Sequence, residues 1–207
     1  MRHRRAALAV DGSVFIAQRY AVDWEQLDAE NRIYAGPKTA LGSYTIYGKP
    51  VLAVADATVV TAINDQPDQV PGQYPPGLTL DQADGNAVII DLGDGVFALY
   101  AHMQPGSVRV HAGERVTRGE IIGLVGNSGN TIAPHLHFQT MDRPASLAAN
   151  GVPYEIDSFR ITGISPGTEA FDQAEANGTP LDVTPVSPPQ QISNSLPLDQ
   201  LIIAFGP

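Results

Sequence analysis

Residues 126–138 read Gly126-Asn127-Ser128-Gly129-Asn130-Thr131-Ile132-Ala133-Pro134-His135-Leu136-His137-Phe138, a glycine-rich turn that runs into a strand. The strand carries histidines at positions i and i+2. Because side chains in a strand alternate between its faces, His135 and His137 point the same way, roughly 6.5–7 Å apart along the strand. That separation suits one metal ligand beside one general base. Two solvated histidines on a sheet surface would give the same pattern, so the surrounding sequence has to decide between these readings.

The other periodic segments of the chain also read as short strands separated by turn signals. Asp11-Gly12 lies between residues 3–10 and 13–22, and a Gly-Asp-Gly turn joins residues 87–92 to 96–102, so both are hairpin signals. Further strands are expected at residues 51–63, 108–110, 120–125 and 135–141. This spacing predicts an all-β fold, an antiparallel sandwich or barrel. No segment predicts a helix longer than two turns.

The chain is expected to divide into residues 1–145, a domain that includes the first hairpin, and residues 146–207, a C-terminal extension packed on it. Within the domain, residues 64–85 contain four prolines and four aspartates without a basic residue, which indicates an insertion loop that is either functional or mobile. In the extension, residues 154–162 alternate like a strand. Residues 163–195 read as a Pro-rich loop, and residues 198–205 read as an edge strand.

Composition excludes several function classes. The 207 residues include 12 Lys and Arg against 22 Asp and Glu, a formal charge of −10, which argues against nucleic acid as a partner. The chain has no cysteine, so a metal would be held by His, Asp or Glu. No apolar stretch reaches the ~20 residues of a membrane helix, and membrane insertion is not expected. The apolar run after Arg5 is only about five residues, shorter than a signal-peptide core, and reads as the first strand.

Five segments, taken in order, resemble the landmarks of the LytM-type zinc endopeptidases, the M23 peptidases that cut peptidoglycan cross-links. They are Tyr20-Ala21-Val22-Asp23-Trp24, residues 48–59, Tyr100-Ala101-His102-Met103, residues 108–124 and the His-x-His run at residues 135–137. The resemblance covers about 120 residues, from Arg19 to Thr140. It implies a barrel-sandwich hybrid with a duplicated motif, a peptidoglycan peptide or other extended peptide as substrate, and a place in the cell envelope or outside the cell.

The same resemblance implies a site of one zinc ion. Asp23 and His137 would be zinc ligands, and His102 and His135 would be the general base and the transition-state stabiliser. Catalytic zinc takes three protein ligands and leaves one position for water, so a third ligand is needed. In the family that ligand lies four residues before the Asp, where this chain has Arg19. Arginine stays protonated and has no lone pair to offer a metal.

Two consequences of Arg19 compete. Its guanidinium could lie beside Asp23 in place of the metal, which would leave a zinc-free pseudoenzyme. Alternatively, another residue supplies the third ligand, and His3 is the candidate. If the first hairpin has a three-residue loop, its paired residue numbers sum to 22 and His3 faces Arg19. A two-residue turn puts His3 opposite Tyr20, on the other face of the sheet.

The leading expectation is therefore a zinc-dependent endopeptidase that hydrolyses peptidoglycan cross-bridges. The first alternative is a metal-free, degenerate LytM-like module that regulates or scaffolds cell-wall remodelling. A second alternative is a carrier or phosphotransferase domain of similar architecture, which the intact Pro134–Phe138 run and the lack of a lysine in a tight turn disfavour. Glu25 and Asp28 follow Asp23 closely, but acidic residues are abundant in this chain and these two are expected to be solvated.

Overall fold

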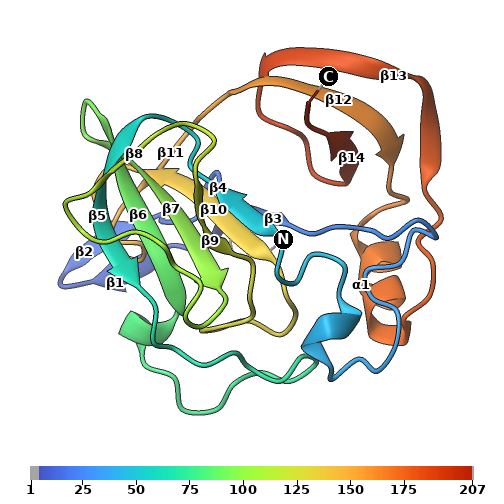
Figure 1. Cartoon of the computed structure of the whole chain (residues 1–207), viewed down its shortest axis with the longest axis horizontal. Helices are drawn as coiled ribbons and strands as arrows, with labels where there is room; N and C mark the ends of the chain where they lie inside the picture. The colour runs from blue at the N-terminus through green and yellow to red at the C-terminus, as the bar shows by residue number, and fades with distance from the viewer. Residues whose placement is uncertain (1–4, 207) are drawn as a thin grey trace.

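The computed structural model describes residues 5–206, and strands make up most of its regular structure (Figure 1). The strands are β1 (Leu8–Val10), β2 (Ser13–Phe15), β3 (Val22–Trp24), β4 (Pro50–Leu52), β5 (Ala57–Ile63), β6 (Asn86–Gly93), β7 (Val96–Met103), β8 (Arg115–Val116), β9 (Ile121–Leu124), β10 (Leu136–Met141), β11 (Gly151–Val152), β12 (Ile156–Ile164), β13 (Thr184–Ser195) and β14 (Leu201–Ala204). The helices are α1 (Thr168–Asn177) and the 3-10 turns η2 (Leu41–Ser43) and η3 (Leu80–Gln82). None of the helices in the described part of the chain is long and apolar enough to cross a membrane.

The largest sheet has seven strands in the order β11-β10-β7-β6-β5-β8, and β3 adds to it by pairing with β10. The pairings among the described strands are antiparallel, as the predicted all-β fold requires. β6 and β7 form the predicted hairpin, with Ile90 opposite Ala98. The sheet and the smaller sheets that accompany it confirm the antiparallel, mainly β class (Figure 1).

The core lies on both faces of the central strands. On one face, Val88 and Tyr100 pack with Val51 and Ile122 of the two-stranded sheet β4-β9. On the other face the buried cluster consists of Ala87, Ile89, Leu99, Ala101, Met141 and Ala149. A strand that is buried on both faces reads as a continuous apolar run, which is why β6 and β7 show little alternation in sequence. The result is a rigid platform whose end carries His102.

The first hairpin has the second of the two registers that the sequence left open, the two-residue turn. Leu8 pairs with Phe15 and Val10 with Ser13, so the paired residue numbers sum to 23 and the turn has two residues. Asp11 and Gly12 both have positive φ, 48° and 77°, as a two-residue turn of the hairpin type requires. The three-residue loop that would have placed His3 opposite Arg19 is therefore wrong. His3 itself lies outside the described residues.

The predicted strand over residues 13–22 is also wrong, because it is interrupted. β2 ends at Phe15, and the chain turns with the Ala21 amide donating to the Gln18 carbonyl at 3.2 Å. It then enters β3, which joins a different sheet by pairing with β10. Residues 108–110 do not form a strand either, although Arg109 donates one backbone hydrogen bond to Ile122 at 3.0 Å. Both segments have a β-type sequence throughout, so the sequence revealed neither the interruption after Phe15 nor the absence of a strand at residues 108–110.

The loop at residues 64–85 is anchored to the His-x-His segment. Asp68 accepts a hydrogen bond from the Asn127 amide at 2.7 Å and another from the Tyr47 hydroxyl at 2.7 Å. The Asn86 amide, directly after the loop, donates to Ser128 Oγ at 2.8 Å. The loop therefore holds the glycine-rich turn of residues 126–129 in place.

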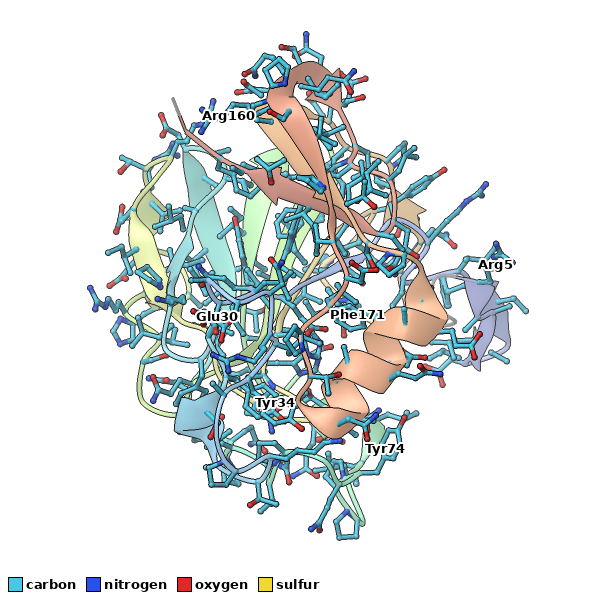
Figure 2. All side chains as sticks on the ribbon, turned by 90° about the vertical axis from the view of Figure 1, so that its right-hand side faces the viewer. Arg5, Glu30, Tyr34, Tyr74, Arg160 and Phe171 are labelled. Atoms are coloured by element: carbon cyan, nitrogen blue, oxygen red, sulfur yellow. The ribbon has the colours of Figure 1, made fainter. Side chains whose placement is uncertain are left out.

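The predicted loop over residues 163–195 is wrong in two places, since it contains α1 and β13. α1 begins after Gly167 and ends at Gly178, whose φ of 67° provides a left-handed cap. Phe171 packs from α1 onto the cluster that includes Tyr34, and Figure 2 shows both side chains beside the helix. Tertiary packing of this kind stabilises a short helix of weak amphipathic pattern.

The rest of the extension forms a three-stranded sheet with the order β13-β12-β14, seen in orange to dark red in Figure 1. β12 confirms the strand predicted near residues 154–162, and β14 confirms the predicted edge strand. β13 was missed because its Pro-rich sequence is typical of loops. As an edge strand, however, it tolerates proline, which has no N–H to donate to a neighbour.

Candidate metal centre

The pairing of β3 with β10 brings Asp23 and His137 together. Their Cα atoms are direct partners across the two strands, and Asp23 Oδ1 lies 2.8 Å from His137 Nδ1. The same carboxylate oxygen lies 3.7 Å from His135 Nε2. The two histidines of the His-x-His run therefore share one face and one acidic neighbour, as the alternation of side chains in a strand predicted.

His102 reaches the same point from β7. Its ring centre lies 4.7 Å from that of His135 and 5.9 Å from that of His137. The residue has a φ of 62°, which is uncommon for a residue with a side chain, and its backbone N–H donates to the Asp84 carbonyl at 2.9 Å. A left-handed residue of this kind costs about 1–3 kcal/mol and persists where its surroundings hold it. Here the strained backbone directs the ring toward the other two histidines.

Carbonyl groups fix the orientation of two of the rings. His102 Nδ1 lies 2.8 Å from the Ser128 carbonyl oxygen, and His135 Nδ1 lies 2.8 Å from the Ala133 carbonyl oxygen. A carbonyl accepts only, so each Nδ1 carries the proton and donates it. The Nε2 atom of each ring is then left with its lone pair. Both rings accordingly offer a base or a metal ligand at Nε2.

His137 is only 4% exposed and lies between two acceptor oxygens. Its Nε2 is 2.9 Å from Gln139 Oε1, and Gln139 Nε2 donates to the Met141 sulfur at 3.6 Å, which fixes the amide orientation. His137 Nε2 therefore donates to Gln139, while Nδ1 faces Asp23 Oδ1. Two facing acceptor atoms at 2.8 Å need a proton or a cation between them. An outer hydrogen bond on the second ring nitrogen is also what metal-ligating histidines usually have.

The donor set fits zinc. One ligand atom from each of His102, His135 and His137 lies within 4.8 Å of the other two, and Asp23 Oδ1 borders the same space. Imidazole nitrogen and carboxylate oxygen are the ligands left to a zinc site that has no cysteine. The cluster can therefore hold a metal ion, while the ligand set predicted from the sequence (Asp23, His137 and His3) stays a prediction.

Burial and charge set the protonation of the cluster. Burial lowers the pKa of His102 well below its ordinary value, and the neighbouring His135 and His137 lower it further. Burial also lowers the pKa of His135, against the opposing effect of the Asp23 carboxylate. Burial acts to lower the pKa of His137 too, but the hydrogen bond and charge of Asp23 outweigh it, so that this pKa is raised. At neutral pH, His102 and His135 are thus neutral bases.

Arg19 does not occupy the metal position. Its side chain is exposed, and its guanidinium lies over the ring of Tyr20, 5.4 Å from the ring centre. Among the described residues there is no ion pair between Arg19 and Asp23, so the arrangement required for a guanidinium in place of the metal is not formed. The third ligand predicted from the sequence, His3, lies outside the described residues and stays a prediction.

Sequence reasoning missed two residues that support the site. Gln139 lies at i+2 from His137 on β10, so strand alternation alone could have placed it on the same face. Ser128, fully buried, accepts from the Asn86 amide through its hydroxyl and donates to the Met103 carbonyl at 2.7 Å. It thereby positions the carbonyl that orients His102. Only the fold brings these segments together, and no spacing rule would have indicated Ser128.

The expectation that Glu25 and Asp28 are solvated is wrong for Glu25, while Asp28 is a half-buried residue in a surface ion pair. Asp28 is only 18% exposed and binds Arg32 Nε at 2.9 Å. Oε2 of Glu25 is buried, and burial raises the pKa of this carboxyl well above its ordinary range, helped by the charge of Glu175. Glu25 lines a cleft of about 510 Å³ that lies between the sheet and the C-terminal extension and that also includes Asp23 and His135.

Comparison with known proteins assigns a family to this geometry. Residues 40–151 match the model of peptidase family M23. The peptidoglycan DD-endopeptidase ShyA of Vibrio cholerae is 35% identical over 71 residues, which are 33% of this chain and 16% of that protein. The glycyl-glycine endopeptidase ALE-1 of Staphylococcus capitis is 37% identical over 95 residues, 45% of this chain and 22% of that protein.

These alignments span less than a quarter of either curated relative. Among solved structures, the catalytic domain of the antimicrobial peptidase lysostaphin from Staphylococcus simulans is 26% identical. The match covers 57% of this chain and 84% of that domain, with a TM-score of 0.38.

Proposed function

Since the chain belongs to the M23 peptidase family, we propose that it is a zinc-dependent endopeptidase that hydrolyses peptide bonds in peptidoglycan cross-links. The observation that carries the proposal is the convergence of one carboxylate and three histidines, with Asp23 Oδ1 at 2.8 Å from His137 Nδ1 and the ligand atoms of the histidines within 4.8 Å of one another. Titratable groups are seldom buried together unless they serve a function, and histidines beside a carboxylate are the ligands and bases of hydrolytic metal sites.

Asp23 and His137 would hold the zinc ion, with His3 as the third ligand in place of Arg19. When bound, zinc polarises a carbonyl group and lowers the pKa of bound water toward ~7. The chain supplies the support for this position through Gln139, which accepts the Nε2 proton of His137 at 2.9 Å. That hydrogen bond keeps Nδ1 directed at Asp23.

His102 and His135 would carry the proton transfers. Each presents Nε2 with a lone pair, because its Nδ1 proton is given to a carbonyl. A neutral imidazole whose pKa is lowered accepts a proton from the attacking water and gives it up readily. The ring that has gained the proton can donate to the developing oxyanion or to the leaving amine. The two rings, 4.7 Å apart, are close enough to act on the same peptide bond.

We infer peptidoglycan as the substrate from the names of the related proteins. The names of two of them state a peptidoglycan DD-endopeptidase and a glycyl-glycine endopeptidase, so the family includes enzymes for short peptide cross-links of different composition. A cross-linked substrate is extended, which agrees with a cleft that runs from His135 to the C-terminal extension.

The test combines metal analysis with hydrolysis. The full chain, purified without chelator, is expected to contain one zinc per molecule and to release new amino groups from purified peptidoglycan. Asp23→Ala and His137→Ala should lose both zinc and hydrolysis, whereas His102→Ala and His135→Ala should keep zinc and lose hydrolysis. His111→Ala is the control, because His111 is exposed and pairs only with the neighbouring Glu114. Protein without zinc that releases no amino groups would contradict the proposal.

Two further variants separate the proposal from the metal-free alternative. Arg19→Ala should leave zinc content unchanged, because the Arg19 side chain lies over Tyr20 rather than at Asp23. His3→Ala should lower zinc affinity if His3 is the third ligand, and unchanged affinity would assign that place to another group. A folded chain that binds peptidoglycan but neither zinc nor any other divalent metal would support the regulator or scaffold.

A further inference from the structure

We propose that the cleft between β3 and the C-terminal extension binds a protonated primary amino group of the substrate peptide, immediately beside the candidate metal centre. The identification of the ligand as a peptide rests on the proposed function. The affinity of the cleft for an amine does not, and it can be measured without hydrolysis.

The cleft is built by two parts of the chain. Its inner wall consists of residues 22–25 and the segment that leads to His135, and its outer wall consists of α1 and residues 197–202. The outer wall lies beyond residue 151, where the family match ends. Any preference that this wall imposes therefore belongs to the extension of this chain. Figure 1 shows α1 and β14 on the same side of the large sheet.

The titratable groups that line the cleft, apart from His135, are all acidic. They are five acids from three segments of the chain: Asp23, Glu25, Asp172, Glu175 and Asp199. The lining of the cleft contains no lysine or arginine. The cation that acts on Glu175 is Lys38, but its ammonium donates to the Ala176 carbonyl at 3.4 Å and does not line the cleft.

Two buried oxygen atoms in the cleft have no donor. Glu25 Oε2 and Gln200 Oε1 are both buried and have no hydrogen-bond partner within residues 5–206. Gln200 donates through its own amide nitrogen to Thr168 Oγ1 at 3.4 Å, so its oxygen is the atom left over. A buried acceptor without a donor costs about 1–3 kcal/mol, and two in one cleft are expected to serve a ligand.

The chemistry of these atoms selects the ligand. Gln200 Oε1 is an acceptor, and Glu25 Oε2 is one when its carboxyl is ionised, so the ligand must present donors. A positively charged ligand fits best, because it favours the ionised form of the acids around it. A primary ammonium has three donors and no acceptor, which matches both conditions. A metal ion does not fit as well, because the one close group of possible ligands found in the described residues is the histidine cluster, which contains neither Glu25 nor Glu175.

The position of the cleft ties the amino group to the scissile bond. Asp23 and His135 line the cleft as well as the candidate metal centre. A peptide that extends from the histidines into the cleft would therefore place an amino-bearing side chain, or a free amino terminus, within a residue or two of the bond that is cut. The cleft would therefore determine which residue the enzyme prefers next to the bond that it cuts.

The experiment compares two small probes with the same four-carbon side chain, one of which ends in an ammonium group and the other in a methyl group. N-acetyl-lysine methylamide and N-acetyl-norleucine methylamide are titrated into the metal-free full chain, and binding is followed by NMR. The lysine probe is expected to bind about tenfold more tightly, consistent with one partly buried charged contact. Glu25→Gln and Glu175→Gln should each remove most of that difference. Equal affinities for the two probes would overturn the proposal.

A matched control comes from the same helix. Glu169 is exposed in the first turn of α1 and does not line the cleft, so Glu169→Gln should leave the discrimination between probes unchanged. If Glu169→Gln reduces it as much as Glu175→Gln, the effect is one of overall charge and the site is refuted. Circular dichroism of each variant establishes that it is folded, and the two cleft variants provide independent readings.

Hydrolysis separates this proposal from the proposed function. In zinc-loaded protein, a peptide with lysine near the cleaved bond should have a higher kcat/KM than its norleucine counterpart, mainly through KM. If the protein prefers the lysine probe in binding but hydrolyses neither peptide, the amine site is supported and the endopeptidase activity is rejected. If it hydrolyses both peptides with equal kcat/KM, the endopeptidase activity is supported and the amine site is rejected.

Discussion

Asp23 and His137 are direct partners across two antiparallel strands, and their side chains meet at 2.8 Å on the buried face of the pair. The two residues are more than a hundred positions apart in sequence. The strand pairing that joins them uses only three residue pairs, from Leu136 with Trp24 to Phe138 with Val22. A short piece of sheet therefore sets the geometry on which the proposed metal site depends.

The first prediction concerns this pair in metal-free protein. Asp23→Asn removes a charge-assisted hydrogen bond to a histidine that is 4% exposed, and the free energy of unfolding should fall by about 1–3 kcal/mol. Urea denaturation in the presence of a chelator measures it. Asp94→Asn is the control, because Asp94 is an exposed turn residue with a φ of 50°, which asparagine adopts easily. An equal loss in both variants would show that the pair contributes nothing.

The second prediction concerns the support of His102. Ser128→Ala leaves the buried Asn86 amide without its partner, at a cost of about 1–3 kcal/mol, while the Met103 carbonyl keeps its second hydrogen bond, from Asn86 Nδ2 at 3.1 Å. It should also shift the NMR signals of the His102 ring, which donates to the Ser128 carbonyl. The exposed Ser13→Ala should change neither the stability nor the spectrum. A Ser128→Ala protein as stable as the wild type would be inconsistent with this network.

The third prediction concerns the close approach of two backbones. A Cβ atom at Gly126 would lie 2.4 Å from the Gln104 nitrogen, and Gly126 donates to the His102 carbonyl at 3.0 Å. Gly126→Ala should therefore destabilise the fold by about 1–3 kcal/mol and move His102. Gly42→Ala, where no atom lies within 4 Å of the added carbon, should be nearly neutral. Thermal unfolding of both variants tests the difference.

The fourth prediction concerns acid. The backbone hydrogen bond from Arg32, its guanidinium and the backbone hydrogen bond from Glu30 lower the pKa of Asp28 below its ordinary value of 3.8. A lowered pKa means that the folded state holds the ionised form more strongly. The stabilising contribution is therefore complete above about pH 5 and is lost as the pH falls through the folded-state pKa. Asp28→Asn should lose less stability between pH 7 and pH 3 than the wild type. If the pH dependence of stability is the same in Asp28→Asn and in the wild type, the Asp28 carboxylate does not contribute to the loss of stability in acid.

The fifth prediction concerns the wall of the cleft. Phe171 is the side chain of α1 that packs on the cluster of Ile33, Tyr34, Tyr44 and Ala133. Phe171→Ala should cost about 1.5–3 kcal/mol and increase hydrogen exchange along α1. Gln173→Ala, at an exposed position of the same helix, should have little effect. If exchange along α1 is the same in both variants, Phe171 does not hold the helix.

The predictions that the structure confirms are those that depend on residue spacing within a single strand or a single turn. The Gly-Asp-Gly turn gave the hairpin of β6 and β7, and His135 and His137 share a face because a strand alternates. The failures came where distant contacts decide. Proline argued against β13, yet an edge position accepts it, and α1 depends on the cluster beneath Phe171 rather than on its own pattern.

Residue type and order were enough to predict the mainly β class and to single out Asp23, His102, His135 and His137, which the fold brings together. The roles of these residues, and the loss of a metal ligand at Arg19, stay predictions. Only the tertiary structure decided that Arg19 turns toward Tyr20, that Glu25 is buried, and that the extension closes a cleft beside the histidines. The physical reason is that burial and the pairing of distant segments set these features. A carboxylate that looks solvated in a sequence loses its water when α1, more than a hundred residues later, packs beside it.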